Sequence, residues 1–207
     1  MSWGAERTAA RDTLLARVAA AADGVRIPVV LIDGPSGAGK STLADLLVAC
    51  WPGGETVRLI RMDDLYPGWG GLDAASAGLS ETLLGPLART GRGRWRRWDW
   101  AAGEPGEWQS VEGPGPVVVE GCGTLARRSV PWAHLRLWLD ADDALRKERA
   151  LDRDGETFVT HWDGWQRDFE RYLAREDPRA AADLRLDVTG WPLFFSCHPP
   201  AGTTVAP

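Results

Sequence analysis

One stretch of the sequence combines residue types and a spacing that suit the binding of a polyphosphate. The residues from Gly34 to Ser41 read GPSGAGKS and match the pattern G-x-x-x-x-G-K-[ST] in full. An apolar run at 27–32 precedes them, and residues 42–47 follow with helical spacing. This order of strand, glycine-rich turn and helix is the context in which the pattern forms a phosphate-binding loop.

Each residue type in this loop has a chemical reason to be there. The glycines let the backbone approach an anion closely and adopt positive φ angles, and the first N–H groups of the following helix point toward the same place. Lys40 would bring a positive charge to the β- and γ-phosphates of a nucleotide, and Ser41 would offer a hydroxyl oxygen to Mg²⁺. Of the 24 lysine and arginine residues in the chain, only Lys40 and Lys147 are lysines, so lysine at position 40 runs against the composition. We therefore expect the loop to bind ATP through Gly34, Pro35, Ser36, Gly37, Ala38, Gly39, Lys40, Ser41 and Thr42.

Two acidic positions follow other predicted strands. Asp63 comes just after a strand predicted at 56–61, and Glu120 ends a buried, apolar strand. Because ligands of parallel sheets bind at the carboxyl ends of the strands, we expect both acids to face the loop. Phosphoryl transfer to an alcohol needs a carboxylate near the attacking hydroxyl, a role that suits Asp63, with Asp64 as its competitor. Glu120 would join Ser41 in holding the metal.

Three arginines share one face of a predicted helix. Arg146, Arg149 and Arg153 are spaced i, i+3 and i+7, and this spacing aligns their guanidinium groups. Such a face can close over the phosphate during transfer and exclude water. A solvated face paired with acids such as Glu148 and Asp152 explains the spacing equally well.

The segment 92–100 interleaves arginines with tryptophans. Tryptophan faces can stack on a planar base, and arginine can bind phosphate or stack as well. Tyr66, three residues after Asp63, is a further candidate to contact an acceptor. The alternative is a hairpin packed by its own tryptophans, since residues 91–115 are predicted as a long loop or a short hairpin. The candidate substrate-binding residues are Asp63, Tyr66, Arg94, Trp95, Arg97, Trp98, Asp99 and Glu120.

The elements that must position these residues alternate between strand and helix. Strands are predicted at 27–32, 56–61, 116–121, 135–139 and 184–188, and helices at 5–22, 42–49, 73–89, 142–153 and 160–176. This alternation predicts an α/β fold with three α/β/α layers around a mostly parallel five-stranded sheet and a helical lid. We expect one phosphate-loop kinase domain over residues 1–190, with the lid at about 142–176 and an acceptor-binding excursion at about 66–112. The remaining residues, 191–207, have no periodicity and are expected to form a flexible tail.

Composition narrows the classes of partner. A net charge of −5 argues against a broad nucleic-acid footprint. No apolar run approaches the ~18 residues that a membrane span needs, and the charged N-terminal segment does not read as a secretory signal. Three widely spaced cysteines form no disulfide framework, so we expect a cytoplasmic protein. Whether it forms a homodimer stays open.

Several of these motifs together resemble the uridine kinase family of phosphate-loop kinases, within the nucleoside monophosphate kinase-like fold. The resemblance spans roughly residues 27–189. The residues at 63–66, DDLY, resemble the D-x-F-Y motif of that family with Leu65 in place of Phe, and 120–121 resembles its strand-end E-G. The arginines at 146–153 resemble its lid.

This resemblance implies roles for the residues that match. Asp63 would be the catalytic base, Tyr66 would contact the acceptor, and Glu120 would support Mg²⁺. The segment 178–184 resembles the P-x-x-x-x-A-D segment of the family, which implies that the backbone at Ala182 and Asp183 lines the adenine pocket. The Trp-Asp stretch at 98–100 resembles the Y-D-F substrate segment only loosely, and nothing here matches the substrate histidine that follows the aromatic-Asp pair in that family.

We therefore expect an ATP- and Mg²⁺-dependent small-molecule kinase that phosphorylates a hydroxyl of a nucleoside-like acceptor. In that reading Lys40, Asp63, Arg146, Arg149 and Arg153 are the catalytic residues. One alternative is a nucleoside monophosphate kinase, because the loop string also resembles that of cytidylate kinases and the arginines at 92–97 could hold a second phosphate. The other is an ATP-binding regulatory NTPase without a small-molecule acceptor.

Overall fold

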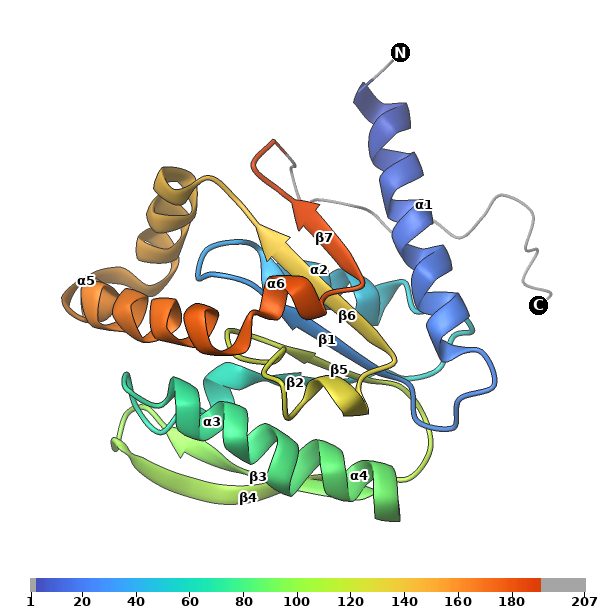
Figure 1. Ribbon diagram of the computed structural model, residues 1–207, viewed down its shortest axis with the longest axis horizontal. Helices are drawn as coiled ribbons and strands as arrows, with labels where there is room; N and C mark the ends of the chain where they lie inside the picture. Colours follow the sequence, from blue (N-terminus) through green and yellow to red (C-terminus); the bar gives the residue numbers. More distant parts are fainter. Residues whose placement is uncertain (1–2, 191–207) are drawn as a thin grey trace, which may run out of the picture.

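The computed structural model describes residues 3–190, so the expected tail at 191–207 lies outside the described residues. A five-stranded sheet in the order β2-β5-β1-β6-β7 forms its centre (Figure 1). Its strands are β1 (Val29–Asp33), β2 (Arg58–Arg61), β5 (Val117–Glu120), β6 (Leu135–Asp140) and β7 (Leu184–Asp187). All neighbouring strands pair in parallel, which confirms the expected fold class.

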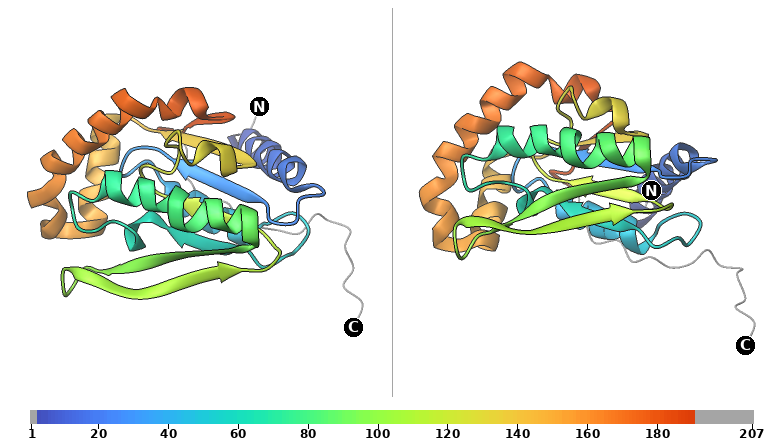
Figure 2. Two further views of the ribbon diagram at one scale, coloured as in Figure 1. Left: turned by 60° about the horizontal axis from the view of Figure 1, so that its bottom comes forward. Right: turned by 90° about the horizontal axis from the view of Figure 1, so that it is seen from below.

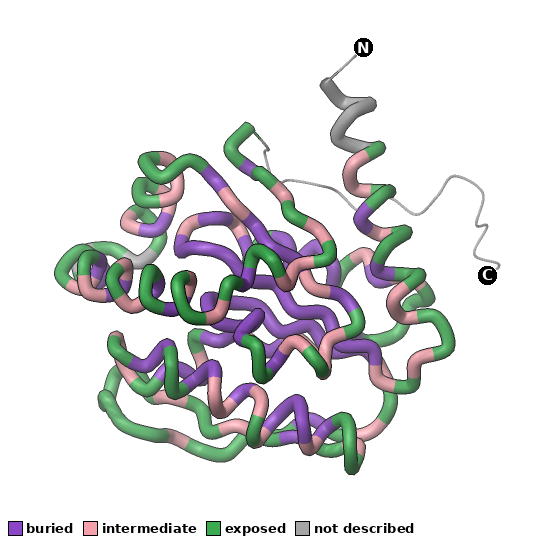
Figure 3. The backbone as a smooth tube through the Cα atoms, in the orientation of Figure 1, coloured by how far each residue is buried: buried purple, intermediate pink, exposed green. Residues whose placement is uncertain are grey.

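Helices cover both faces of this sheet, because its strands are apolar on both sides (Figure 3). On one face lie α1 (Trp3–Ala22) and α2 (Lys40–Ala49), which pack on Val30 and Ile32 of β1. Val29 and Leu31, on the other face of β1, belong to a second hydrophobic core, which four further helical elements complete. These are α3 (Leu72–Gly78), the π-helical turn η2 (Leu79–Leu84), α4 (Gly85–Thr90) and α5 (Asp143–Glu176). Shorter elements are the 3-10 turns η1 (Met62–Asp64) and η3 (Val130–Trp132) and the helix α6 (Pro178–Ala181).

A β-hairpin, and not a long loop, follows the helical run 72–90. Its strands are β3 (Arg92–Asp99) and β4 (Glu104–Glu112), which pair antiparallel with an irregularity between Arg96 and Trp98. The hairpin forms a separate two-stranded layer against the helical run (Figure 2). A Cβ at Gly93 would overlap the backbone oxygen of Leu83 in η2, so glycine allows the two layers to approach this closely.

The two helices predicted at 142–153 and 160–176 join into one element with a sharp bend. At Gly155 the backbone of α5 has φ 66° and ψ −158°, a conformation outside the helix and favourable only to glycine. A loop leads from the carboxyl end of β6 to the first arm, and after the bend the second arm runs back toward α6 (Figure 1). The bend therefore brings residues of the second arm over the same strand ends as residues of the first.

None of the described helices is long and apolar enough to cross a membrane. The sequence predicts no disulfide framework, but Cys50 is disulfide-bonded. Cys122, in contrast, is a free and buried thiol.

Candidate active site

The loop between β1 and α2 is packed so tightly that glycine is required at two positions. A Cβ at Gly34 would overlap the backbone oxygen of Leu139 in β6, and a Cβ at Gly37 would overlap the backbone oxygen of Arg146 in α5. Both glycines also have positive φ angles, 147° and 80°. The loop is thus held between the end of β6 and the start of α5, with its backbone free to surround an anion.

We expect Gly37→Ala to weaken ATP binding at least about tenfold, because the new Cβ must push the loop or the start of α5 aside and the backbone is strained at that φ. Isothermal titration with ATP and Mg²⁺ measures the effect. Gly78→Ala is the matched control, since Gly78 lies in α3 with no atom within 4 Å of its added Cβ. Equal affinities for the two variants would contradict the role given to the loop.

Asp33, the last residue of β1, holds the start of the loop through a hydrogen bond from Gly34 N. It was not among the site residues predicted from the sequence. Its carboxylate is fully buried and accepts hydrogen bonds from Gly34 N at 2.7 Å, Leu125 N at 2.8 Å and Tyr172 Oη at 2.6 Å. Burial raises the pKa of Asp33, and the bonds from Tyr172 and the backbone oppose that change. An acid at the end of a buried strand was the signal for Glu120, and the same signal was present at Asp33.

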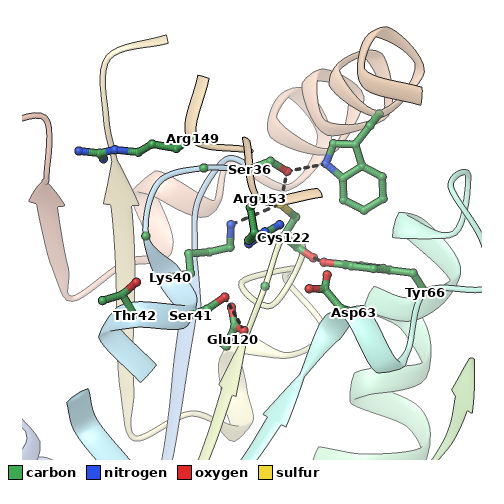
Figure 4. A pocket seen from close by; sticks show the side chains of 14 residues that line it. Ser36, Lys40, Ser41, Thr42, Asp63, Tyr66, Glu120, Cys122, Arg149 and Arg153 are labelled. Carbon is green, nitrogen blue, oxygen red and sulfur yellow. Dashed lines mark hydrogen bonds between the residues drawn. The ribbon is translucent and has the colours of Figure 1, made fainter. Parts of the chain in front are cut away.

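Lys40 and Ser41 open α2 and face the end of β5. Lys40 is buried, and its Nζ donates to Pro35 O at 2.9 Å within the loop. Ser41 Oγ donates to Glu120 Oε1 at 3.0 Å, and Arg61 Nη1 lies 2.9 Å from the same oxygen. Glu120, which is 3% exposed, therefore keeps two partners beside the loop: the hydroxyl of Ser41 (Figure 4) and the guanidinium of Arg61.

These oxygen donors fit Mg²⁺. Phosphate-binding sites hold this ion through one or two protein ligands, while phosphate oxygens and waters complete the coordination. Ser41 and Glu120 both border the cavity next to the loop. In the described part of the chain no group of three or more histidine, cysteine or acidic residues could hold a metal by itself, so a nucleotide would have to supply the remaining ligands.

The cavity beside the loop has a volume of about 330 Å³. Lys40 and Glu120 lie on one side of it, and Asp63 and Tyr66 lie on the other (Figure 4). Its remaining walls are Ser36, Gly37, Gly39, Ser41, Thr42, Gly121, Cys122, Arg149, Arg153 and Trp165. The structure thus brings together three chain segments that the sequence placed at strand ends, because β2, β5 and β1 are neighbours in the sheet.

A second cavity of about 410 Å³ adjoins the first. Asp63, on the turn η1, lines both cavities. The neighbouring acid, Asp64, accepts a hydrogen bond from Arg97 Nε of the hairpin at 3.0 Å and lines neither. The walls of the second cavity are Ser36, Asp63, Tyr66, Trp69, Trp100, Arg153, Thr157, Phe158 and Trp165.

Two of the three predicted arginines reach the first cavity. Arg149 and Arg153 line it, and Arg149 Nη1 is buried without a hydrogen-bond partner in the described structure. The structure places Arg146 elsewhere: its guanidinium pairs with Asp143 at 2.7 Å and donates to Gln166 at 3.1 Å. Because these partners come from the two arms of α5, Arg146 holds the bend together and does not face the phosphate site.

The hairpin residues proposed for substrate binding do not line either cavity. Arg94 lies 4.5 Å above the ring of Trp108, and Trp95 packs against the core. Asp99 closes the hairpin turn by accepting from the backbone N–H groups at 101 and 102. Arg97 pairs with Asp64, and Trp98 borders an outer groove with Arg97 and Asp99. The aromatic residue of this segment that reaches the site is Trp100, whose Nε1 donates to Asp63 O at 2.8 Å.

The residues assigned to the adenine pocket, Ala182 and Asp183, also lie elsewhere. They precede β7, whose first residue pairs with Leu137, so they lie at the amino ends of the strands and the loop lies at the carboxyl ends. Asp183 accepts hydrogen bonds from the backbone N–H and Nε of Arg136, at 2.8 and 2.9 Å. This pair ties β6 to the start of β7, which is a structural role.

Seven wall residues of the two cavities were absent from the sequence-based set: Trp69, Trp100, Gly121, Cys122, Thr157, Phe158 and Trp165. Twelve tryptophans are many for 207 residues, and this excess was the signal for an aromatic cleft. It did not show which tryptophans form the cleft, because they come from three distant parts of the chain.

No family model matches the sequence, and no curated protein matches it. Solved structures do match. One is described as a possible uridine kinase from Bacillus stearothermophilus and gives a TM-score of 0.63 at 20% identity, covering 85% of this chain and 96% of that chain. Another, a candidate fructose transport system kinase from Silicibacter sp. TM1040, gives a TM-score of 0.50 at 18% identity, covering 84% and 97%.

The chain therefore has the fold of the phosphate-loop kinases. The expected resemblance to the uridine kinase-like proteins is confirmed at the level of the fold. The names of those proteins do not identify the acceptor of this chain, because the likeness at 18–20% identity concerns the fold.

Proposed function

We propose that this protein is an ATP- and Mg²⁺-dependent kinase that transfers the γ-phosphate of ATP to a hydroxyl of a nucleoside-like small molecule. The observation that carries the proposal is the position of Asp63, which borders both the cavity beside the phosphate loop and the adjoining aromatic cavity. A carboxylate between a phosphate donor and an acceptor can orient the hydroxyl and accept its proton.

The residues of the first cavity divide the work of binding. Lys40 would exchange its contact with Pro35 O for the phosphate oxygens of ATP, alongside the backbone N–H groups of the loop. Arg149 and Arg153 would bring charge to the transferred group. Ser41 and Glu120 would hold Mg²⁺, which would supply positive charge against the phosphates of ATP. The new bond forms between the acceptor oxygen and the γ-phosphorus, the bond from this phosphorus to the bridging oxygen breaks, and the hydroxyl proton passes to Asp63.

The first alternative, a nucleoside monophosphate kinase, needs cations for the phosphate of the acceptor. The hairpin arginines that would supply them have other contacts, such as Arg92 with Glu112 at 3.5 Å and Arg96 with the carbonyl of Gly106 at 2.9 Å. Among the residues that line the second cavity, Arg153 is the cationic one. An uncharged acceptor therefore suits this cavity better than a nucleotide.

The second alternative, an NTPase without an acceptor, leaves the second cavity without a role. A volume of about 410 Å³ next to Asp63 is large enough for a molecule of nucleoside size. The proposed partner is thus a small molecule, with neither a nucleic-acid polymer nor a membrane involved. The cytoplasmic location stays a prediction.

ADP formation from ATP and Mg²⁺, measured with nucleosides, with nucleoside monophosphates and without acceptor, tests the proposal. We expect nucleosides to stimulate ADP formation, and Arg94→Ala to change kcat/KM less than about twofold, because Arg94 stacks on Trp108 away from the site. Turnover with monophosphates alone, together with a large loss in Arg94→Ala, would establish the first alternative. A rate that no acceptor increases would favour the second.

A further inference from the structure

The second cavity is bounded mainly by aromatic rings. Tyr66 and Trp69 come from the segment after β2, Trp100 from the hairpin turn, and Phe158 and Trp165 from the second arm of α5. Such a wall offers a large apolar area that stacks on flat groups. A sugar with many hydroxyls would leave those hydroxyls without partners against this wall, which is costly.

The polar atoms of three of these rings are turned toward the protein. Trp165 Nε1 donates to Ser36 Oγ at 2.9 Å, and Trp100 Nε1 donates to Asp63 O at 2.8 Å. Tyr66 Oη donates to Cys122 O at 2.9 Å, and burial raises the pKa of this phenol well above its ordinary value. The carbon atoms of these rings therefore face the cavity, and their N–H and O–H groups are already bonded and cannot donate to a ligand.

The aromatic wall is also fixed in place before any ligand binds. Trp69 stacks on Phe158, with 5.2 Å between ring centroids and 18° between planes, and on His161, with 4.6 Å and 13°. Its ring centroid lies 4.9 Å from that of Trp100. Trp69 thus joins the segment after η1, the hairpin and α5, and little conformational freedom is lost when a ligand enters.

The charged groups of this cavity lie at one end of it. Asp63 and Arg153 line both cavities and so mark the boundary with the phosphate site. A hydroxyl at that boundary meets the groups needed for transfer, while the rest of the acceptor meets aromatic rings. The cavity is therefore polar where phosphate transfer would occur and apolar beyond it.

We infer that the acceptor is an uncharged alcohol carried on an aromatic ring system, held by stacking and not by hydrogen bonds to the edge of its ring. This inference rests on the proposed kinase function and narrows its acceptor. It implies that the enzyme discriminates weakly between different planar rings. It also implies strong discrimination against acceptors that lack a ring or carry a phosphate.

A panel of acceptors tests this directly through kcat/KM for ADP formation: uridine, adenosine, 3-(hydroxymethyl)pyridine, D-ribose, D-fructose and uridine monophosphate. We expect the values for uridine and adenosine to agree within about tenfold. The value for D-ribose should be roughly 10- to 100-fold lower, because it keeps the hydroxymethyl group and loses the stacking ring. If D-ribose or D-fructose is the best acceptor, the inference is overturned and ATP-dependent phosphate transfer stands. If uridine monophosphate is the best acceptor, the inference is overturned and the first alternative, a nucleoside monophosphate kinase, takes its place. A panel without any turnover would overturn both.

Substitution of the wall separates stacking from general damage. Trp69→Ala should raise KM for the acceptor about tenfold or more and change KM for ATP less than about twofold, and Trp69→Phe should recover most of the loss. Trp108→Ala is the matched control, since this tryptophan is 52% exposed and lines neither cavity. Should Trp69→Ala fail to fold in a thermal melt, Trp100→Leu, at a partly exposed position on the hairpin turn, gives the same readout. An unchanged acceptor KM in a folded variant would refute the role of stacking.

Discussion

The Asp63→Asn variant should bind ATP nearly as tightly as the wild-type protein but turn over at least ~10²-fold more slowly. An amide cannot accept the proton of the attacking hydroxyl, and loss of a general base typically costs 10²- to 10⁴-fold in rate. The substitution keeps the size of the side chain, and the bond from Trp100 to the backbone oxygen of Asp63 is unaffected. Single-turnover rates and an ATP titration separate chemistry from binding.

The neighbouring acid supplies the control for this experiment. Asp64 pairs with Arg97 on the exposed side of the hairpin, and such pairs contribute little to stability. Asp64→Asn should therefore change turnover by less than about threefold. If Asp64→Asn turns over slowly and Asp63→Asn does not, Asp64 is the base. If both variants turn over at the wild-type rate, neither residue is the base.

Lys40→Ala should weaken ATP binding and lower kcat by roughly 10²- to 10³-fold, the usual cost of removing one group that stabilises developing charge. Because Lys40 is one of two lysines, the other provides a control. Lys147 is an exposed residue of α5 whose Nζ lies 5.6 Å from the centre of the Trp162 ring, outside the cavity. Lys147→Ala should behave as the wild type in the same assays.

A thermal melt has to accompany the Lys40→Ala data, since the substitution also removes the donor to Pro35 O in a buried place. If Lys40→Ala is unfolded, its loss of ATP binding says nothing about the role of the charge. Lys40→Met, which keeps the apolar part of the side chain, is then measured in place of Lys40→Ala. Normal ATP affinity and turnover in a folded variant would contradict the assignment of the loop.

The order of elements could be predicted well because its signals are local. Apolar runs at 27–32 and 116–121 became the central strands β1 and β5, and the helical spacing at 73–89 became the run from α3 to α4. The end of each strand was also local information, so the sequence placed Asp63 and Glu120 correctly at one edge of the sheet. Because β1, β5 and β2 pair in parallel, their carboxyl ends lie at the same edge of the sheet, and no further information was needed to bring the two acids together.

The hairpin residues lie outside the two cavities for a different reason. The composition of 92–100 indicated stacking and cations, but it did not say which way each side chain turns. Arg94 and Trp95 alternate between the outer surface and the core, as successive residues of a strand must. Trp100 reaches the site because it follows the strand, at the turn. Arg146 lies on the same arm of α5 as Arg149 and Arg153, but its guanidinium pairs with Asp143 and donates to Gln166 of the second arm, contacts that the helical spacing did not reveal.

The sequence by itself determined the phosphate loop, the alternation of strands and helices, and the acids at the strand ends, because short-range patterns encode each of them. The tertiary structure decided which arginines face the loop and which rings form the aromatic cavity. It also decided that Tyr172, 139 residues away, would secure Asp33 at the base of the loop. Contacts of this kind depend on how distant segments pack on the sheet, and no local pattern specifies that packing.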